Sequence, residues 1–176
     1  MRSFYLIKTA NKKDSDKSKK MISDGISAAG GAASGVLLQE DIPYLVQVLQ
    51  GKKGYKSFSL PVELGLLGGS VAAPLLAKQM GSSDAEINRS AGIGVIAGAL
   101  GKGLHRIYNL KQATKVLDEI PKSEKNELLA ESKDLFKKLI KQEAKLQGQT
   151  MGGIGTVGAA QAYFAHKAVN NSKKEQ

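Results

Sequence analysis

Small residues recur at every fourth position in four separate segments of this sequence. The series are Ser27, Gly31 and Gly35 in residues 21–39; Gly65, Gly69 and Ala73 in residues 58–80; Ser90, Gly94 and Gly98 in residues 85–108; and the pairs Gly155 and Ala159, and Gly158 and Ala162, in residues 150–169. On an α-helix, residues four apart share one face, so a neighbouring backbone can approach closely there. Glycine costs a helix about 1 kcal/mol relative to alanine, and close packing must offset that cost. The pattern predicts an all-α fold whose Gly/Ala-rich helices pack through small-xxx-small contacts.

A fifth segment, residues 123–147, has the pattern of one long amphipathic helix. Ser123 suits the N-cap, and two glutamates follow it near the positive end of the helix dipole. We expect Gly148 to end this helix. One stripe is apolar and the opposite face is rich in Lys and Glu, which predicts that the stripe is buried against a partner. The residues of this predicted interface are Leu128, Leu135, Phe136, Leu139 and Leu146.

Apart from residues 21–39, the segments before residue 58 have less regular patterns. Residues 1–20 read as a basic, flexible arm because Lys, Asp, Ser and Asn dominate after a short apolar patch. Residues 42–50 are ambiguous between helix and strand, and Pro43 suits a first helical turn. Residues 51–54 (Gly-Lys-Lys-Gly) predict a turn.

Glycine and proline mark further boundaries along the helical region, residues 21–169. Pro74 should kink or end the second segment, and Gly81 followed by Ser83 or Asp84 predicts a helix end and a new start. Segments 58–80 and 85–108 are therefore expected to form a helical hairpin. Residues 109–120 continue as an amphipathic helix as far as Pro121, and residues 170–176 form a polar tail.

The charge of the chain favours anionic partners without favouring sequence-specific recognition. The net charge is +10, and only three of the 26 basic residues are arginines. Lysines neutralise phosphates, whereas arginine forks usually read bases. We therefore expect attraction to anionic membranes, or non-specific contact with nucleic-acid phosphates, and no base-specific reading.

Catalytic chemistry finds little support in the sequence. Residues 92–97 and 153–158 have the spacing of a dinucleotide-binding loop, but the required preceding strand is missing in both cases. His105 and His166 stand alone, and the chain has no cysteine. We expect a non-enzymatic protein with no catalytic residue, no cofactor, no metal site and no small-molecule substrate.

The charge-free stretches are borderline as membrane spans. Residues 25–39, 64–77 and 90–101 are shorter than the roughly 18–20 apolar residues of a span, and residues 146–165 contain three glutamines. Mean hydropathy is −0.22. Two interpretations remain open: a dry helical core, or helices that enter a membrane only when they associate.

The Gly/Ala-rich borderline helices, the Lys-rich arm and the charged amphipathic helix together resemble the small internal virion proteins of tailed phages. That resemblance implies a structural protein that is stored in the particle, ejected, and associated with the host membrane during genome delivery. Its partners would be further copies of itself or other structural proteins. The four small-residue segments are also similar to the mitochondrial preprotein-translocase channel family. That likeness implies an alternative, a channel or translocase subunit of a cellular membrane. A soluble helical scaffold or adaptor is the third possibility.

Overall fold

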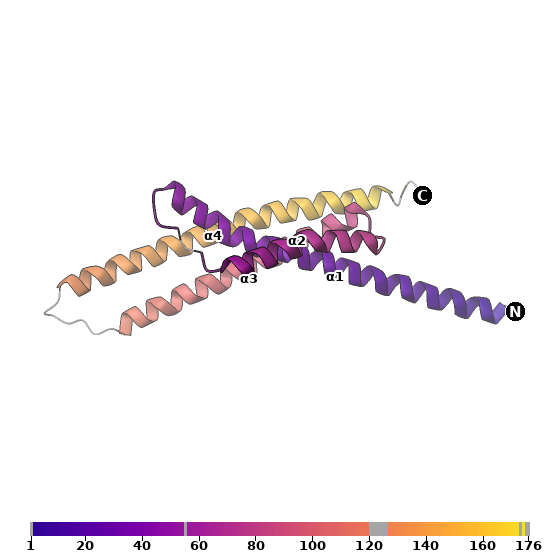
Figure 1. Cartoon of the computed structure of the whole chain (residues 1–176), viewed down its shortest axis with the longest axis horizontal. Coiled ribbons are helices and arrows are strands. Elements are labelled where there is room, and N and C mark those ends of the chain that lie inside the picture. The colour runs from indigo at the N-terminus through magenta and orange to yellow at the C-terminus, as the bar shows by residue number, and fades with distance from the viewer. Residues whose placement is uncertain (1, 55, 120–126, 173, 175–176) are drawn as a thin grey trace.

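The computed structural model describes residues 2–54, 56–119, 127–172 and 174, with side chains from residue 14 onward and, in the last helix, from residue 131. The predicted all-α fold is confirmed. The described residues form α1 (Arg2–Leu49), α2 (Leu60–Gln79), α3 (Asp84–Glu119) and α4 (Glu127–Ser172), with no strand among them. Figure 1 shows an elongated arrangement in which α1, α3 and α4 run along the long axis.

Helix α1 is longer than the sequence suggested. It includes residues 2–20, where a flexible arm was expected, and it continues through Pro43, which was placed in a first helical turn. No glycine or proline interrupts the chain from Arg2 to Ser23, and Asp16 precedes Lys20 at the supporting four-residue spacing. Residues 14–20 are nevertheless exposed, as a basic surface segment should be. Pro43 is fully buried, so tertiary packing outweighs its local cost.

The ends of α2 and α3 largely follow the predicted boundaries. Gly51, in the turn before α2, has φ +71°, and Gly81 after α2 has φ +92°, both in the left-handed region that favours glycine. Ser83 caps α3, because its Oγ accepts the N–H of Glu86 (3.3 Å) while its own N–H donates to that carboxylate (3.2 Å). Pro74 does not end α2, which continues to Gln79.

Helix α4 is continuous through Gly148, where an end was expected. Gln147 and Thr150 on either side are buried, so packing holds this turn in the helix. Helix α3 runs to Glu119 and so includes the predicted extension. The proposed cap at Ser123, the stop at Pro121 and residues 173, 175 and 176 of the polar tail lie outside the described residues, while residues 170–172 belong to α4.

Helix α3 forms the centre of the packing, with α1 on one side and α4 on another. Helix α2 packs mainly on α1 and hardly touches α3, so the two do not form the expected packed hairpin despite the short turn between them. Buried apolar side chains are few among the described residues, and Val95, Ala99 and Ile154 form a cluster with Ile42 packed against it. The molecule exposes 12403 Å², whereas a compact monomer of this mass exposes about 8,200 Å².

Candidate functional site

Glycines interdigitate where α1 crosses α3. A β-carbon added to Gly31 or Gly35 would collide with the backbone of α3 at Ala91 or Val95. A β-carbon added to Gly94 or Gly98 would in turn collide with the backbone of α1, at Ala28 and Ala32. The two helix backbones are thus in direct contact, and the glycines on each side make that contact sterically possible.

Polar side chains continue this crossing at its N-terminal end. The hydroxyl of buried Ser27 donates to the carbonyl of Ser23 (2.9 Å), and that of buried Ser90 donates to Asp24 (2.9 Å). Lys20 forms an ion pair with Glu86. This hydrogen-bonded pairing lowers the pKa of Glu86 to about 2, against the opposing effect of partial burial.

The remaining predicted small residues occupy different environments. Ala73 is buried and lies where a β-carbon on Gly30 would collide with it, so it belongs to the α1–α2 contact. Gly65, Gly69 and Gly155 have open space around the position of a β-carbon, and Ala159 is exposed. The close contact expected at Gly69 is therefore absent within the chain.

The close contact between α3 and α4 uses Gly158 and Ala162, which the four-residue spacing predicted, and Gly92, which that pattern did not include. A β-carbon on Gly92 would lie 2.8 Å from the carbonyl oxygen of Gly158, and one on Gly158 would lie 2.9 Å from that of Gly92. The signal was present in the sequence as the Gly-x-Gly spacing of Gly92 and Gly94. Residues two apart on a helix point in nearly opposite directions, so α3 can receive a neighbour on each side.

A buried polar network joins α1, α3 and the chain segment before α2. Glu40 is fully buried, and its carboxylate accepts from Lys102 (3.2 Å), Arg106 (3.1 Å) and the Ser57 hydroxyl (2.9 Å). Burial raises the pKa of Glu40, but the hydrogen bonds from Ser57 and the two positive charges outweigh this effect and hold it below its ordinary value. Glu40 is therefore ionised, and it fixes one end of α1 against α3.

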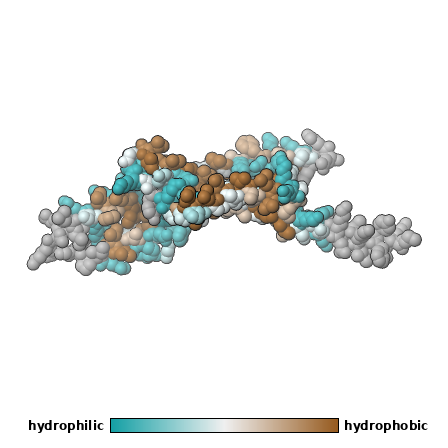
Figure 2. All heavy atoms as spheres, in the orientation of Figure 1, coloured by the Kyte–Doolittle hydropathy of each residue, from teal (hydrophilic) through white to brown (hydrophobic). Residues whose placement is uncertain are grey.

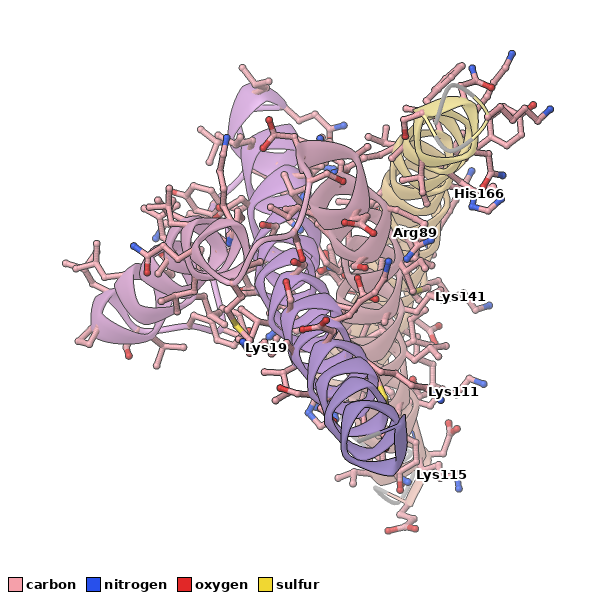
Figure 3. All side chains as sticks on the ribbon, turned by 90° about the vertical axis from the view of Figure 1, so that its right-hand side faces the viewer. Lys19, Arg89, Lys111, Lys115, Lys141 and His166 are labelled. Carbon is pink, nitrogen blue, oxygen red and sulfur yellow. The ribbon has the colours of Figure 1, made fainter. Side chains whose placement is uncertain are left out.

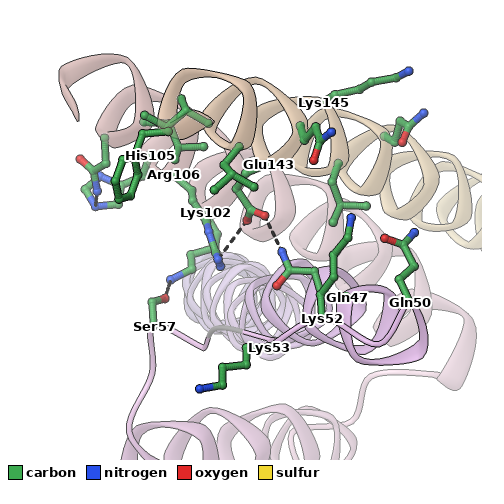
Figure 4. A pocket seen from close by; sticks show the side chains of 18 of the residues that line it. Gln47, Gln50, Lys52, Lys53, Ser57, Lys102, His105, Arg106, Glu143 and Lys145 are labelled. Carbon is green, nitrogen blue, oxygen red and sulfur yellow. Dashed lines mark hydrogen bonds and ion pairs between the residues drawn. The ribbon is translucent and has the colours of Figure 1, made fainter. Parts of the chain in front are cut away.

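The network extends to α4 through Glu143. This carboxylate accepts from Arg106 (3.0 Å) and from the side-chain amide of Gln147 (2.9 Å), and Gln47 of α1 donates to it as well (2.5 Å). Gln39 completes the set by donating to the side-chain oxygen of Gln147 (2.8 Å). Figure 4 shows the dashed contacts that join Glu143 to α1 and α3. A set of directed polar bonds of this kind favours one register of the three helices.

The predicted amphipathic stripe on α4 is not covered by the chain itself. Leu135, Phe136 and Leu139 are 59%, 55% and 50% exposed, and Leu146 is partly buried. The expected burial therefore does not occur within one chain, and the side chain of Leu128 lies outside the described residues. Phe136, Leu139 and Leu146 instead form part of a groove of about 1170 Å³ beside the polar network (Figure 4).

Helix α2 is the most exposed apolar element. Only Ala73 and Ala77 are buried among its twenty residues, and Figure 2 shows apolar surface along the middle of the molecule. Its exposed large side chains are Leu60, Val62, Leu64, Leu67, Val71, Leu75 and Leu76. By length and composition, two described stretches are apolar enough to cross a membrane: residues 14–49 and Leu60–Gln79.

The two histidines lie on exposed helix surfaces, each with an asparagine one turn further on. His105 is 3.2 Å from Asn109, and His166 is 3.0 Å from Asn170. Figure 3 shows His166 with Arg89, Lys111, Lys115 and Lys141 along the side of the molecule formed by α3 and α4. Among the described residues, no three His, Asp or Glu side chains form a group that could hold a metal ion.

Comparisons with known proteins found no match for the chain, whether to a protein-family model, a curated protein or a solved structure.

Proposed function

We propose that this chain is a non-enzymatic assembly protein that associates with membranes through α2. One observation carries the proposal: a twenty-residue apolar helix of which only two small residues are buried. At 1.5 Å per residue, α2 is about 30 Å long, which equals the thickness of a bilayer's hydrocarbon core. Lys56 precedes this helix and Lys78 lies in its last turn, so cations flank the apolar stretch at both ends.

The exposed area supports the same proposal. The chain exposes about 4,000 Å² more than a compact monomer of its mass. Seven large apolar side chains of α2 are between 46% and 67% exposed. Covering the exposed half of each would contribute about 1 kcal/mol per side chain, or about 7 kcal/mol in all. Glu63 lies in the first turn and pairs with Lys56 (3.2 Å), which suits the level of the lipid headgroups.

The setting we propose is the virion of a tailed phage, where the chain would assemble with copies of itself or with other structural proteins. The resemblance of the sequence to small internal virion proteins supports this setting, and so do the exposed apolar faces of α2 and α4. A protein stored in a particle has partners that cover such faces until it is released. Mass spectrometry of purified particles tests the setting directly, since a virion component must co-purify with them.

The membrane proposal can be tested by fluorescence, because the chain contains no tryptophan. Leu67→Trp places a single reporter on α2, and Val116→Trp places one at similar exposure (54% and 61%) near the end of α3. With anionic vesicles, we expect the emission of the Leu67 variant to shift to the blue and that of the Val116 variant to change little. Equal responses from both reporters, or none from the first, would refute insertion through α2.

A second candidate function is that of an integral membrane channel or translocase subunit. The observation in its favour is that two stretches, residues 14–49 and α2, pass the length and composition test for a span. The first stretch contains Asp24 and the ion-paired Glu40, which are costly inside a membrane. Thiol labelling of Leu38→Cys separates the two functions, because vesicles protect this residue of α1 from a water-soluble reagent only if α1 crosses the bilayer as well as α2.

A further inference from the structure

The groove beside the polar network combines an apolar floor with a cationic border. Its floor includes Phe136, Leu139 and Leu146 of α4. Five cations line it: Lys52, Lys53, Lys102, Arg106 and Lys145. Glu143 is the only acidic residue of this lining. The groove is therefore strongly positive for its size, and an apolar ligand could contact its floor.

The inner cations are already neutralised by the protein. Lys102 and Arg106 pair with Glu40 (3.2 and 3.1 Å), and Arg106 pairs with Glu143 (3.0 Å). Among the described acidic residues, none forms an ion pair with Lys52, Lys53 or Lys145, and all three lysines are exposed. Figure 4 shows Lys52 extending from the turn after α1 towards α4, whereas Lys53 extends to the opposite side. The charge available to a ligand thus lies at the mouth of the groove.

The groove also adjoins the helix that we propose enters the membrane. Ser57 and Phe58 belong to its lining, and they lie immediately before the first residues of α2. If the N-terminal end of α2 lies at the level of the headgroups, the mouth of the groove lies there too. We propose that this groove binds an anionic phospholipid, with the phosphate at Lys52 and an acyl chain along Phe136, Leu139 and Leu146.

This inference rests on the proposed membrane association. A groove of about 1170 Å³ also has room for about ten residues of helix, taken as a cylinder 10 Å wide with a rise of 1.5 Å per residue. An acidic amphipathic helix, including one from a second copy of the chain, is therefore the competing occupant. The continuity of the groove with α2 favours lipid, because a membrane that receives α2 brings anionic headgroups to the lysines.

Short-chain lipids below their micelle concentration test the groove without any membrane. Phe136→Trp supplies a reporter on the floor, and native mass spectrometry of the unaltered chain counts bound lipid independently. We expect monomeric phosphatidylglycerol to bind saturably and to change the emission, whereas phosphatidylcholine of equal chain length binds far more weakly. Inorganic phosphate at the same concentration should neither change the emission nor displace the lipid.

The charge requirement is tested by two matched double variants. Lys52→Gln with Lys53→Gln should weaken phosphatidylglycerol binding about fivefold, since an exposed ion pair contributes up to about fivefold and only Lys52 extends towards the groove. Lys111→Gln with Lys115→Gln removes the same charge from exposed sites that do not line the groove (Figure 3) and should leave binding unchanged.

Several results would overturn the lipid assignment. Equal binding of both lipids, equal loss in both double variants, or no adduct in the mass spectrum of the unaltered chain would each do so. An emission change that depends on protein concentration alone would assign the groove to a second copy. The Leu67→Trp variant reports on insertion of α2 independently of the groove. The two experiments therefore distinguish an absence of lipid binding in the groove from an absence of membrane insertion.

Discussion

Because α1 crosses α3 at close range, we expect alanine to have opposite effects on stability at two glycines that lie seven residues apart on α3. Gly94 faces the backbone of α1, where an added β-carbon would lie 2.8 Å from the carbonyl carbon of Ala28 and 2.9 Å from the nitrogen of Ala32. Gly101 has no atom within 4 Å of the same position. The change to alanine is identical at both sites, so the difference between them isolates the effect of packing from that of helix propensity.

The expected magnitudes follow from two competing effects. Replacing a helical glycine by alanine stabilises the helix by about 1 kcal/mol. At Gly101 nothing opposes this gain, so Gly101→Ala should raise the Tm by about 2–4 °C. At Gly94 the methyl group meets backbone that cannot rotate away, so overpacking costs about 3 kcal/mol. The net loss of about 2 kcal/mol should lower the Tm of Gly94→Ala by about 4–8 °C.

Thermal unfolding followed by circular dichroism measures both variants under the same conditions. Gly98→Ala should behave like Gly94→Ala, because its β-carbon meets the backbone of Ala32. If Gly94→Ala and Gly98→Ala are as stable as Gly101→Ala, α1 and α3 do not pack backbone to backbone. That result would refute the inference that the small residues form packing surfaces.

Three further predictions concern the charged groups and α2. Glu40→Gln leaves Lys102 and Arg106 short of a carboxylate and should cost about 3–5 kcal/mol in unfolding experiments, whereas Asp41→Asn, at a half-exposed pair, should cost less than 1 kcal/mol. Because the pKa of Glu86 falls from 4.5 to about 2 on folding, its stabilising effect is present above about pH 4.5 and is lost as the pH falls to 2. The parent should therefore have a Tm about 2–4 °C above that of Glu86→Gln at pH 7, and this difference should vanish near pH 2. Replacing Leu64 and Leu67 by serine should reduce binding to anionic vesicles more than tenfold while leaving the Tm almost unchanged, since both side chains are more than half exposed.

The sequence predicted the helices better than their ends. Capping at Ser83 and the left-handed Gly81 were predictable because each depends on local chemistry. The passage of α1 through Pro43, and of α4 through Gly148, depends instead on burial of distant residues against those turns. Single-residue preferences of about 1–3 kcal/mol are overridden where tertiary contacts are extensive.

The buried network was beyond prediction for a similar reason, although one signal was present. Glu40 stands in a largely apolar stretch of α1, and a buried carboxylate requires a partner. Its partners, Lys102 and Arg106, lie more than sixty residues away on α3. Nothing in their four-residue spacing distinguishes them from exposed lysine pairs such as Lys111 and Lys115. Only the crossing set by the glycines brings the three charges together.

The buried polar groups and the exposed apolar groups, taken together, support the proposed assembly role. A chain that only needed to be stable would bury its leucines and leave its glutamates in water, because burial of apolar area is the main stabilising effect in folding. Here Glu40 and Gln39 are fully buried, while Leu67 and Phe136 are more than half exposed. Directed polar bonds and glycine contacts hold α1, α3 and α4 in one register, so the apolar faces of α2 and α4 are available for an external partner. Covering those faces, by lipid or by protein, would then contribute the hydrophobic stabilisation that the isolated chain does not obtain from its own core.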